Sequence, residues 1–419
     1  MIKDAHRLRH IGIFDTTLRD GEQAPGYSLT IDQKVQLALK LEALGVNTIE
    51  CGFPMSSPVD FEATREMCRL FKRARPCGFA RALPADVEAC ARAMKDATNP
   101  QIEIASVGSD IHILYKRETT RERVVTEAIA AIDCARAHGF TDISIAAEDA
   151  TRSDLEFLKR LLGACIERGV TTIAIPDTVG ACIPEEFFGL IRDLRAFIGD
   201  IRISVHCHND MGLAVANSLA GIQAGADEVQ TTLCGIGERA GNTSLEELIV
   251  VLNSKVDTLH RVHDVIHHRL YDTCMMLARF LDLDVPAHKP ILGENSFSSE
   301  AGMHQQGLIK HRFTYEHLRA EDYGTVPRMV LGRHSGRNLI RQRLREDGIR
   351  DVQDKLVDKL YEQMIHDADH RRYSQPGTLG AMYGVLASPP ASPGPAASPP
   401  AAAGTAKHHV EQARLAVNE

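Results

Sequence analysis

The sequence predicts an α/β fold, a (β/α)8 TIM barrel followed by a helical C-terminal appendage. Eight short runs rich in β-branched residues occur within the first 250 residues, and they begin 26 to 40 residues apart. Amphipathic helical stretches fill the intervals, and this alternation is typical of a closed parallel barrel. The alternative is an open doubly wound sheet, which is disfavoured because no G-x-G-x-x-G follows the first run.

The predicted elements follow one another in a regular order. Asp32 and Asp60 stand where helix N-caps are expected, before the helical patterns QKVQLALKLEAL and FEATREMCRLF. Four glycines stand where the chain leaves a helix towards the next strand: Gly45, Gly139, Gly169 and Gly225. The eight predicted strands are Ile11–Asp15, Val46–Cys51, Pro76–Phe79, Ile102–Ser106, Asp142–Ala146, Thr172–Ile175, Arg202–His206 and Glu228–Thr231.

Three regions are predicted along the chain. Residues 1–255 form the barrel, and residues 256–375, in which helical patterns replace the alternation, form the appendage. The third region, 386–419, is a Pro/Ala-rich tail. Its segment from Ser388 to Thr405 holds six of the 18 prolines and cannot bury a core, so the tail is predicted to be disordered.

Composition and charge exclude several classes of protein. The 44% hydrophobic and 25% charged fractions are those of an ordinary globular chain and exclude wholesale disorder. A net charge of −8 argues against a nucleic-acid-binding surface. No apolar run approaches the roughly 18 residues of a membrane span, and no apolar stretch follows the charged N-terminus as in a secretory signal. Ten cysteines without a C-x-x-C pair indicate reduced thiols of a cytoplasmic protein.

Functional side chains of such a barrel lie at the C-terminal ends of its strands. Polar and ionisable residues gather there after six of the eight predicted strands, so one rim is expected to carry the chemistry. These residues are Arg19, Asp20, Glu22, Gln23, Glu50, Glu148, Asp149, Asp177, Thr178, His206, His208, Asn209, Asp210, Glu238, Arg239 and Asn242.

His206 and His208 form the most informative pair on this rim. Residues i and i+2 of a strand point to the same face, so the two imidazoles can bind one divalent ion. A carboxylate from another strand end completes a two-histidine, one-carboxylate site with open positions, and Asp20 is the predicted third ligand. The side-chain oxygen of Asn242 is expected near the ion. The alternative is a chance pair of hydrogen-bonded histidines.

Other rim residues have two interpretations. Arg19 is either a surface charge or a guanidinium that binds a carboxylate and polarises a substrate oxygen beside the metal. Glu148 is either a solvated residue or a group that orients a water or shares a proton. Thr178 is weak evidence alone, because hydroxyls often follow strands. In the appendage, His304 and Tyr315 stand eleven residues apart, and a lone histidine is usually structural.

Taken together, these motifs resemble the 2-isopropylmalate synthase and homocitrate synthase family, which are metal-dependent, acetyl-CoA-condensing barrel enzymes. The similarity runs from about residue 11 to 340, about four fifths of the chain, and HCHND followed by GIGERAGN is its most specific part. The matching motifs are DTTLRDGEQAPG, GFPMSSPVDFEA, SDIHILYK, AEDATRSDLEFL, IPDTVG, VHCHNDMGLAVANSLAGIQAGA, GIGERAGNTSLEE, GENSFSSEAGMHQQGLIKHR and LGRHSGR.

The resemblance implies a reaction. Acetyl-CoA loses a methyl proton, the enolate attacks the ketone of a 2-oxo acid, and hydrolysis of the thioester releases CoA and a tertiary 2-hydroxy diacid. A ketone is a poor electrophile until a Lewis acid polarises it, and a thioester methyl is a very weak acid, so a metal and a well-placed base fit this chemistry. The resemblance implies Mg²⁺, Mn²⁺, Zn²⁺ or Co²⁺ as the metal, and acetyl-CoA as co-substrate.

The resemblance also implies the roles of individual residues. Asp20, His206 and His208 hold the metal, Arg19 binds and polarises the 2-oxo group, Thr178 contacts the substrate carboxylate, and Gln23 belongs to the same substrate site. His304 and Tyr315 act at the acetyl group, and Glu148 assists proton transfer. In relatives the appendage reaches the barrel of a neighbouring subunit, which implies a homodimer.

The chain departs from the family in two places. Leucine-synthesis members carry a regulatory domain after the appendage, which the printed sequence does not contain, so leucine feedback is in doubt. Lysine-pathway homocitrate synthases have an arginine at the position of Ser144 and a glutamate at the position of Asp20, and this chain has neither. Two alternatives within the family are a nitrogenase-type homocitrate synthase and an enzyme that condenses a phosphonylated or phosphinylated pyruvate. Two further alternatives are a hydroxymethylglutaryl-CoA lyase and a catalytically inactive interaction protein. In such lyases a cysteine-bearing glycine loop stands where this chain has GIGERAGN.

The substrate is predicted to be a small 2-oxo acid, with 2-oxoisovalerate first and a diacid or phosphonate as its rival. An acidic distal group needs a cation, since an unpaired buried charge is costly. Ser144 supplies none. Arg81, just after the third strand, is the remaining candidate, and its alternative role is to pair with a carboxylate of the protein.

Overall fold

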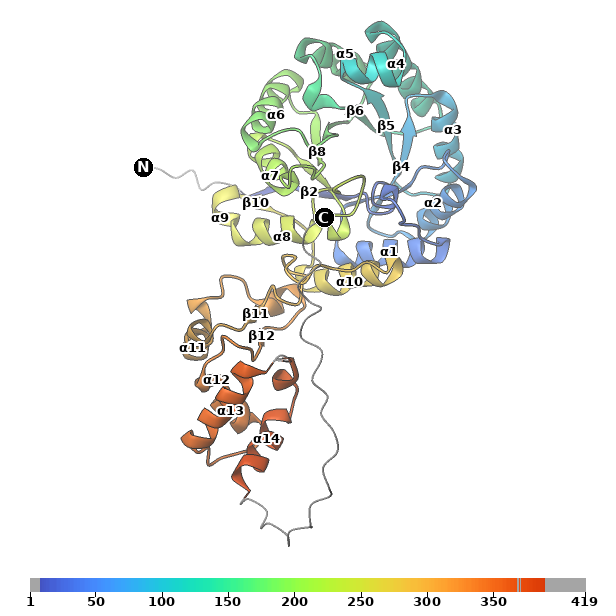
Figure 1. The fold of residues 1–419 in the computed structure, drawn as a ribbon. Helices are drawn as coiled ribbons and strands as arrows, with labels where there is room; N and C mark the ends of the chain where they lie inside the picture. Colours follow the sequence, from blue (N-terminus) through green and yellow to red (C-terminus); the bar gives the residue numbers. More distant parts are fainter. Residues whose placement is uncertain (1–7, 368, 370, 389–419) are drawn as a thin grey trace, which may run out of the picture. The chain divides into compact units, whose positions relative to one another are not determined.

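The computed structural model describes residues 8–367, 369 and 371–388, and it confirms the predicted closed parallel barrel (Figure 1). The eight strands pair in sequence order, and the first closes the barrel against the last through the register Gly12 with Glu228. Every predicted strand matches an observed one to within two residues at either end. The strands are β2 (Gly12–Asp15), β3 (Thr48–Gly52), β4 (Arg75–Arg81), β5 (Gln101–Val107), β6 (Asp142–Glu148), β7 (Thr172–Asp177), β8 (Arg202–Cys207) and β9 (Glu228–Thr231).

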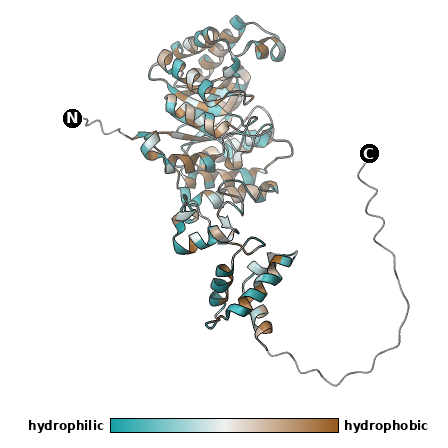
Figure 2. Cartoon of the chain, turned by 60° about the vertical axis from the view of Figure 1, so that its left-hand side comes forward, coloured by the Kyte–Doolittle hydropathy of each residue, from teal (hydrophilic) through white to brown (hydrophobic). Residues whose placement is uncertain are grey.

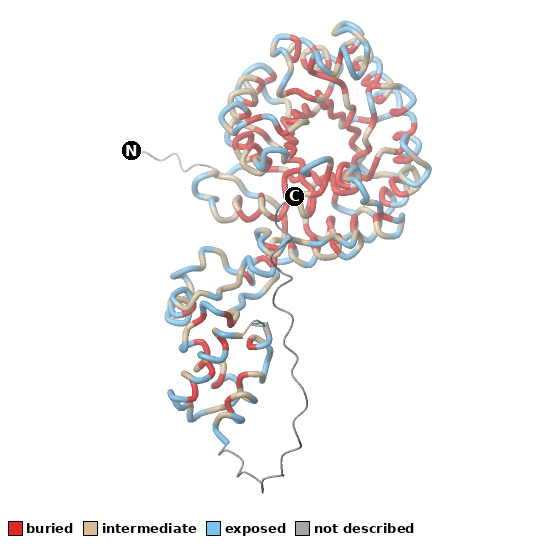
Figure 3. The backbone as a smooth tube through the Cα atoms, in the orientation of Figure 1, coloured by how far each residue is buried: buried red, intermediate tan, exposed pale blue. Residues whose placement is uncertain are grey.

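Helices surround the barrel, and each follows the strand before it (Figure 1). Their buried faces pack on the strands, so that buried residues form the inner layers in Figure 3 and hydrophilic and hydrophobic residues alternate along the helices in Figure 2. The helices are α1 (Ile31–Leu44), α2 (Pro58–Leu70), α3 (Pro84–Ala93), α4 (Arg121–Ala137), α5 (Leu155–Glu167), α6 (Pro184–Ile198), α7 (Ala214–Ala224) and α8 (Leu245–Ser254). In α5, Leu158, Leu161 and Leu162 are fully buried, and each contributes about 1.5–3 kcal/mol by leaving water.

The predicted N-caps of α1 and α2 are wrong, because hydroxyl residues just upstream cap these helices instead. Thr30 accepts a hydrogen bond from the Gln33 backbone N–H at 3.3 Å, and the Gln33 side chain accepts from Thr30 N–H at 2.9 Å. Ser57 likewise accepts from Asp60 N–H at 3.0 Å. The two predicted aspartates therefore lie in the first helical turn, where the helix dipole favours a negative charge.

The chain divides into two compact units. The first consists of the residues up to Ser299 together with Gly307–Met329, so the predicted boundary at residue 255 falls inside it. Beyond the barrel it contains α9 (Val256–Leu259), α10 (Leu270–Leu281) and two small parallel pairs. The pairs are β1 (Arg9–His10) with β10 (Arg261–Val262), and β11 (Ser298–Ser299) with β12 (Arg328–Met329).

The second unit consists of Glu300–Gln306 and the described residues from Val330 to Ser388. Its helices are α12 (Arg337–Glu346), α13 (Asp354–His366) and α14 (Thr378–Ala387), and α11 (Gly302–Lys310) begins in it. Its small core consists of Leu331, Leu339, Ile340, Leu344, Leu356, Val357, Leu360, Met364, Tyr373, Leu379 and Tyr383. The predicted tail, 386–419, lies outside the described residues from residue 389 onward. Among the described helices, none combines the length and apolar character needed to cross a bilayer.

Candidate metal centre and active site

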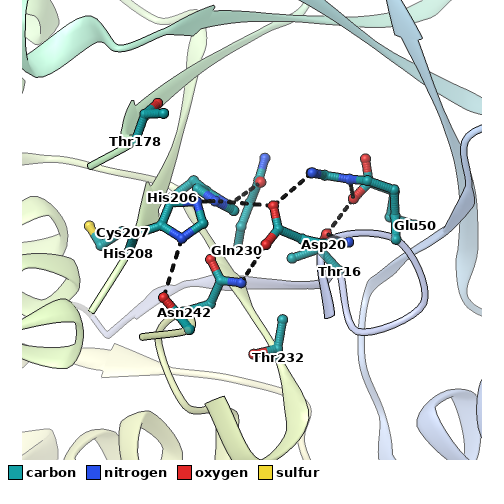
Figure 4. Close-up of polar contacts among 12 residues, drawn as sticks. Thr16, Asp20, Glu50, Thr178, His206, Cys207, His208, Gln230, Thr232 and Asn242 are labelled. Atoms are coloured by element: carbon teal, nitrogen blue, oxygen red, sulfur yellow. Dashed lines mark hydrogen bonds and ion pairs between the residues drawn. The ribbon is translucent and has the colours of Figure 1, made fainter. Parts of the chain in front are cut away.

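The three predicted metal ligands lie together at the C-terminal end of the barrel (Figure 4). Asp20 follows β2, His206 is on β8, and His208 follows that strand directly. The two histidine Nε2 atoms are 3.1 Å apart, and His206 Nε2 is 3.8 Å from Asp20 Oδ2. Strand alternation explains the arrangement, since Cys207 between the histidines points the other way, towards α7, where Ser218 is its partner.

Hydrogen bonds at the far side of each imidazole fix which nitrogen carries the proton. His208 Nδ1 lies 3.2 Å from the Gly241 carbonyl, which only accepts, so this nitrogen donates. Gln230 donates its amide N–H to Glu103 at 2.9 Å, so its oxygen faces His206 Nδ1, also at 2.9 Å, and that nitrogen donates too. Both Nε2 atoms therefore present lone pairs to each other, and this repulsion is relieved when a cation lies between them.

The charges suit a divalent cation. Burial lowers the pKa of His206 to about 3 and also lowers that of His208, so both imidazoles are neutral ligands at physiological pH. Burial by itself raises the pKa of Asp20, but the Arg19 guanidinium, together with His206, His208 and the hydrogen bond from Asn242, outweighs it, and the pKa lies well below its usual range. One carboxylate and two imidazoles form a borderline donor set that suits several divalent ions. These residues thus fit the metal that the sequence implies.

Asn242 holds Asp20 through its amide nitrogen, and the expected position of its oxygen near the ion stays a prediction. Its side-chain N–H donates to Asp20 Oδ1 at 2.7 Å and to the Ile236 carbonyl at 3.1 Å. Its own oxygen, Oδ1, is buried, and no described residue offers it a hydrogen bond. In this arrangement Asn242 orients a ligand.

Arg19 is held rigidly beside the candidate metal position. Its NH1 donates to Asp20 Oδ2 at 2.7 Å, and its Nε donates to Glu50 Oε2 at 2.8 Å. The guanidinium also lies over the Phe79 ring, 4.6 Å from the ring centre. The Glu50 carboxylate is fully buried and also accepts a hydrogen bond from Thr16. Glu50 thus anchors Arg19 in place, a task that its position on the rim did not reveal.

A cavity of about 460 Å³ opens above these residues. Eight predicted site residues line it: Arg19, Asp20, Gln23, Arg81, Glu148, Thr178, His206 and His208. The predicted rim residues Glu238 and Arg239 also line it, and the other lining residues were not among those expected on the rim: Phe53, Phe79, Glu103, Ala105, Val107, Lys116, Arg117, Ala146, Ala174, Pro176 and Gln230. Every lining residue belongs to the chain between Arg19 and Arg239, so the cavity is built by the barrel alone.

Two of the predicted residues on this rim have well-defined partners. Glu148 accepts from Lys116 Nζ at 2.5 Å and lies 3.4 Å from His112 Nδ1. Thr178 accepts from the Asp149 backbone N–H at 2.9 Å, and its hydroxyl can still donate its own hydrogen to another acceptor.

The two predicted residues of the appendage lie elsewhere in the chain. His304 is exposed on α11, in the second unit. Tyr315 belongs to the first unit, directly after the short 3₁₀ turn Arg312–Thr314, and is 54% exposed. Their predicted roles at the acetyl group stay predictions.

Glu103 is the main functional candidate that the sequence analysis missed. It is buried inside the barrel on β5, accepts hydrogen bonds from Ser144 at 3.2 Å and Gln230 at 2.9 Å, and lines the cavity. Burial, reinforced by Glu50, raises the pKa of Glu103 to about 8, so this carboxyl is protonated at neutral pH. The barrel pattern marks only strand ends as functional positions, whereas Glu103 lies inside a strand.

Replacing Gln230 with leucine is expected to weaken metal binding about 10- to 100-fold, the usual effect of losing a group that orients a metal-bound histidine. The leucine has no acceptor for His206 Nδ1, so the tautomer is no longer fixed. Calorimetric titration with Mn²⁺ measures the effect. Gln101→Leu is the matched control, because Gln101 is also a buried barrel glutamine but its amide has no described partner. Equal affinities for the two variants would contradict the assignment.

Comparisons with known proteins place these features in context. The HMGL-like family model matches residues 10–276, and the model described as homocitrate synthase post-HMGL domain-like matches residues 291–372. A curated 2-isopropylmalate synthase from Pyrococcus furiosus is 43% identical over 87% of this chain and 73% of its own length. Its counterpart from Pelotomaculum thermopropionicum is 42% identical over 87% and 72%, and the one from Aquifex aeolicus is 43% identical over 86% and 70%.

Solved structures share the barrel at much lower identity. A hydroxymethylglutaryl-CoA lyase from Bacillus subtilis superposes with a TM-score of 0.58 at 18% identity, over 66% of this chain and 96% of that chain. A lyase from Acinetobacter baumannii, in complex with coenzyme A and 3-methylmalate, gives a TM-score of 0.55 at 18% identity, over 66% and 93%. At this identity the likeness is one of fold.

Proposed function

Since this chain belongs to the HMGL-like family, in its 2-isopropylmalate synthase and homocitrate synthase branch, we propose that it is an acyltransferase that condenses acetyl-CoA with a 2-oxo acid. A carbon–carbon bond forms between the acetyl methyl carbon and the ketone carbon, whose oxygen takes up a proton. Water then cleaves the thioester, and CoA leaves as the free thiol. The observation that carries the proposal is the Asp20, His206 and His208 cluster, with Arg19 beside it, in the barrel cavity.

Asp20, His206 and His208 would hold the divalent metal, which would act as a Lewis acid on the 2-oxo group. The Arg19 guanidinium, fixed by Asp20 and Glu50, is pre-oriented to bind the oxygens of the 2-oxo acid without rearrangement. Thr178 also lines the cavity, and its hydroxyl is available to the substrate carboxylate.

Proton transfer at the acetyl group is assigned to His304 and Tyr315, with Glu148 assisting. Glu148 already lies in the cavity, beside Lys116 and His112. By the family's pattern the appendage of one subunit completes the barrel site of another, so a homodimer is part of the proposal. The partner is a second copy of this chain.

His304→Ala is expected to lower kcat about 10²-fold or more while leaving 2-oxo acid binding nearly intact, the usual scale for an acid–base group. Calorimetry measures binding, and release of free CoA measures turnover. His317→Ala is a control from the same part of the chain. Loss of 2-oxo acid binding with an unchanged kcat would show that His304 binds the 2-oxo acid and does not act at the acetyl group.

The charges of the cavity favour a 2-oxo acid with an uncharged side chain. Arg19 is assigned to the 2-oxo group, and each of the other arginines and lysines that line the cavity is paired with a carboxylate of the protein, so none is left over within the described residues for a second acidic group. The pairs are Arg19 with Asp20 and Glu50, Arg81 with Asp86, Lys116 with Glu148, Arg117 with Glu127, and Arg239 with Asp210. We therefore place 2-oxoisovalerate first, and a homocitrate-forming or phosphonate-condensing activity second.

Arg81→Ala is expected to reduce turnover of all 2-oxo acids alike, or not at all. Asp86 is buried and accepts two hydrogen bonds from the Arg81 guanidinium, at 2.7 and 3.1 Å, so this charge is committed to the protein. The measurement is kcat/KM for 2-oxoisovalerate, 2-oxoglutarate and a phosphonopyruvate. Selective loss of a diacid or phosphonate would make Arg81 the distal anchor and overturn the first choice of substrate.

The direct test of the function is a panel of 2-oxo acids with acetyl-CoA, followed by release of free CoA. Chelation should stop turnover, and Mg²⁺ or Mn²⁺ should restore it. Full activity in exhaustively demetallated protein would refute the metal's role. If no 2-oxo acid of the panel led to release of CoA, the condensation would be refuted.

A further inference from the structure

A second group of metal-ligating side chains lies on the outer helical layer of the barrel, between α3 and α4. Glu88 is on α3, Cys134 is in the last turn of α4, and His138 follows directly as the C-terminal cap of that helix. One ligand atom from each residue lies within 4.8 Å of the other two. The active-site cavity includes none of the three in its lining.

Local structure explains why the three side chains converge. The His138 backbone N–H donates to the Cys134 carbonyl at 3.1 Å, so the two residues are one helical turn apart and share a face of α4. The Cys134 thiol lies 3.9 Å from the carbonyl oxygen of Pro84, the first residue of α3. Glu88 follows Pro84 by four residues, so it occupies the same face of α3, the one turned towards the thiol.

We propose that Glu88, Cys134 and His138 form a second metal site, which binds Zn²⁺ with a water molecule as the fourth ligand. Thiolate, imidazole and carboxylate are the usual zinc ligands, and a thiolate selects zinc over magnesium or calcium. Bonds of about 2.0–2.3 Å place tetrahedral ligand atoms on the order of 3.5 Å apart. Glu88 and His138 are exposed, so their side chains can rotate to close the remaining distance.

The three ligands are available for this task. In the part of the chain that the structure describes, neither the Glu88 carboxylate nor the His138 imidazole has an ion-pair partner. Cys134 is only partly buried, whereas eight of the ten cysteines are buried. Bound zinc would link α3 to α4, and because the unfolded chain lacks the site, zinc should raise the melting temperature with increasing concentration.

Cobalt distinguishes this site from the barrel site, because only this one contains a thiolate. Metal-stripped full-length protein, titrated with Co²⁺ alone, should develop a thiolate-to-cobalt charge-transfer band in the near ultraviolet. The intensity of this band should saturate when one Co²⁺ is bound at this site. Asp20→Asn, which removes a ligand of the barrel site, should leave the band unchanged. Cys134→Ser should abolish it, and His138→Ala should weaken the affinity at least tenfold.

Matched controls make the outcome decisive. Glu66→Gln, which removes an exposed carboxylate on α2, should leave the band unchanged, and Cys134→Ser should leave the condensing activity unchanged. Absence of the band in the wild type, or its persistence in Cys134→Ser, would overturn the proposal. An independent measurement needs no variant: Zn²⁺ should protect Cys134 from alkylation by iodoacetamide, as located by peptide mass spectrometry. Equal labelling of Cys134 with and without Zn²⁺ would also overturn it.

Discussion

Replacing Asp20 with asparagine is expected to abolish metal binding in the barrel and to lower kcat by about three orders of magnitude, the upper range for loss of one preorganised electrostatic group. Both histidine ligands are neutral, since burial lowers the pKa of each. Asp20 therefore supplies the only negative charge among the three proposed ligands. The substitution keeps the size of the side chain, so the loss reports on charge rather than on packing.

Two measurements check the effect of Asp20→Asn: calorimetric titration with Mn²⁺, and release of free CoA at saturating substrates. Asp110→Asn is the matched control, because Asp110 is an exposed carboxylate after β5 that pairs with Arg121 away from the cavity. Retention of wild-type metal affinity by the Asp20 variant would show that the carboxylate is not a ligand.

The barrel was predictable because each of its strands is bounded by local signals. Buried parallel strands are nearly continuous runs of apolar residues, and glycines such as Gly45 and Gly225 end the preceding helices in the left-handed conformation, with φ of 94° and 116°. The N-caps were misplaced because two capping residues are available at each start. Aspartate is a good N-cap residue, but here the upstream Thr30 and Ser57 hydroxyls accept the hydrogen bonds from the free backbone N–H groups.

The site was predictable only where its residues lie at strand ends. His206, His208 and Asp20 follow from the period of a strand and from barrel geometry. The hydrogen bonds that orient His206 do not follow from the sequence, because Glu103 and Gln230 are 127 residues apart and meet only across the closed barrel. No spacing along the sequence signals such a pair. The same limit applies to Glu50, whose buried contact with Arg19 becomes visible only when β2 and β3 are paired.

Arg19→Ala is expected to have the other large effect, a loss of both activity and stability. The guanidinium is the partner of two buried carboxylates, Asp20 and Glu50, and removing one member of a buried ionic cluster costs about 3–5 kcal/mol of unfolding free energy. Activity should fall on the order of 10³-fold, because the group that binds the 2-oxo acid is gone. Urea unfolding measures the first effect and CoA release the second.

The loss of stability should depend on pH in a defined direction. Without Arg19, burial raises the pKa of Glu50 further above its unfolded value, so the folded state of the variant binds the proton more tightly. Such a group favours folding at low pH, and its contribution is lost as the pH rises through the folded pKa. The difference in unfolding free energy between wild type and Arg19→Ala should therefore be smaller at pH 5 than at pH 8.

Arg19→Lys separates the structural role of Arg19 from its role in substrate binding. A lysine ammonium can neutralise Glu50 and restore much of the stability. As a point charge it cannot bridge both carboxylates and still bind the substrate, so activity should remain low. A lysine variant with wild-type kcat/KM would show that charge alone, not the guanidinium fork, is what the site requires.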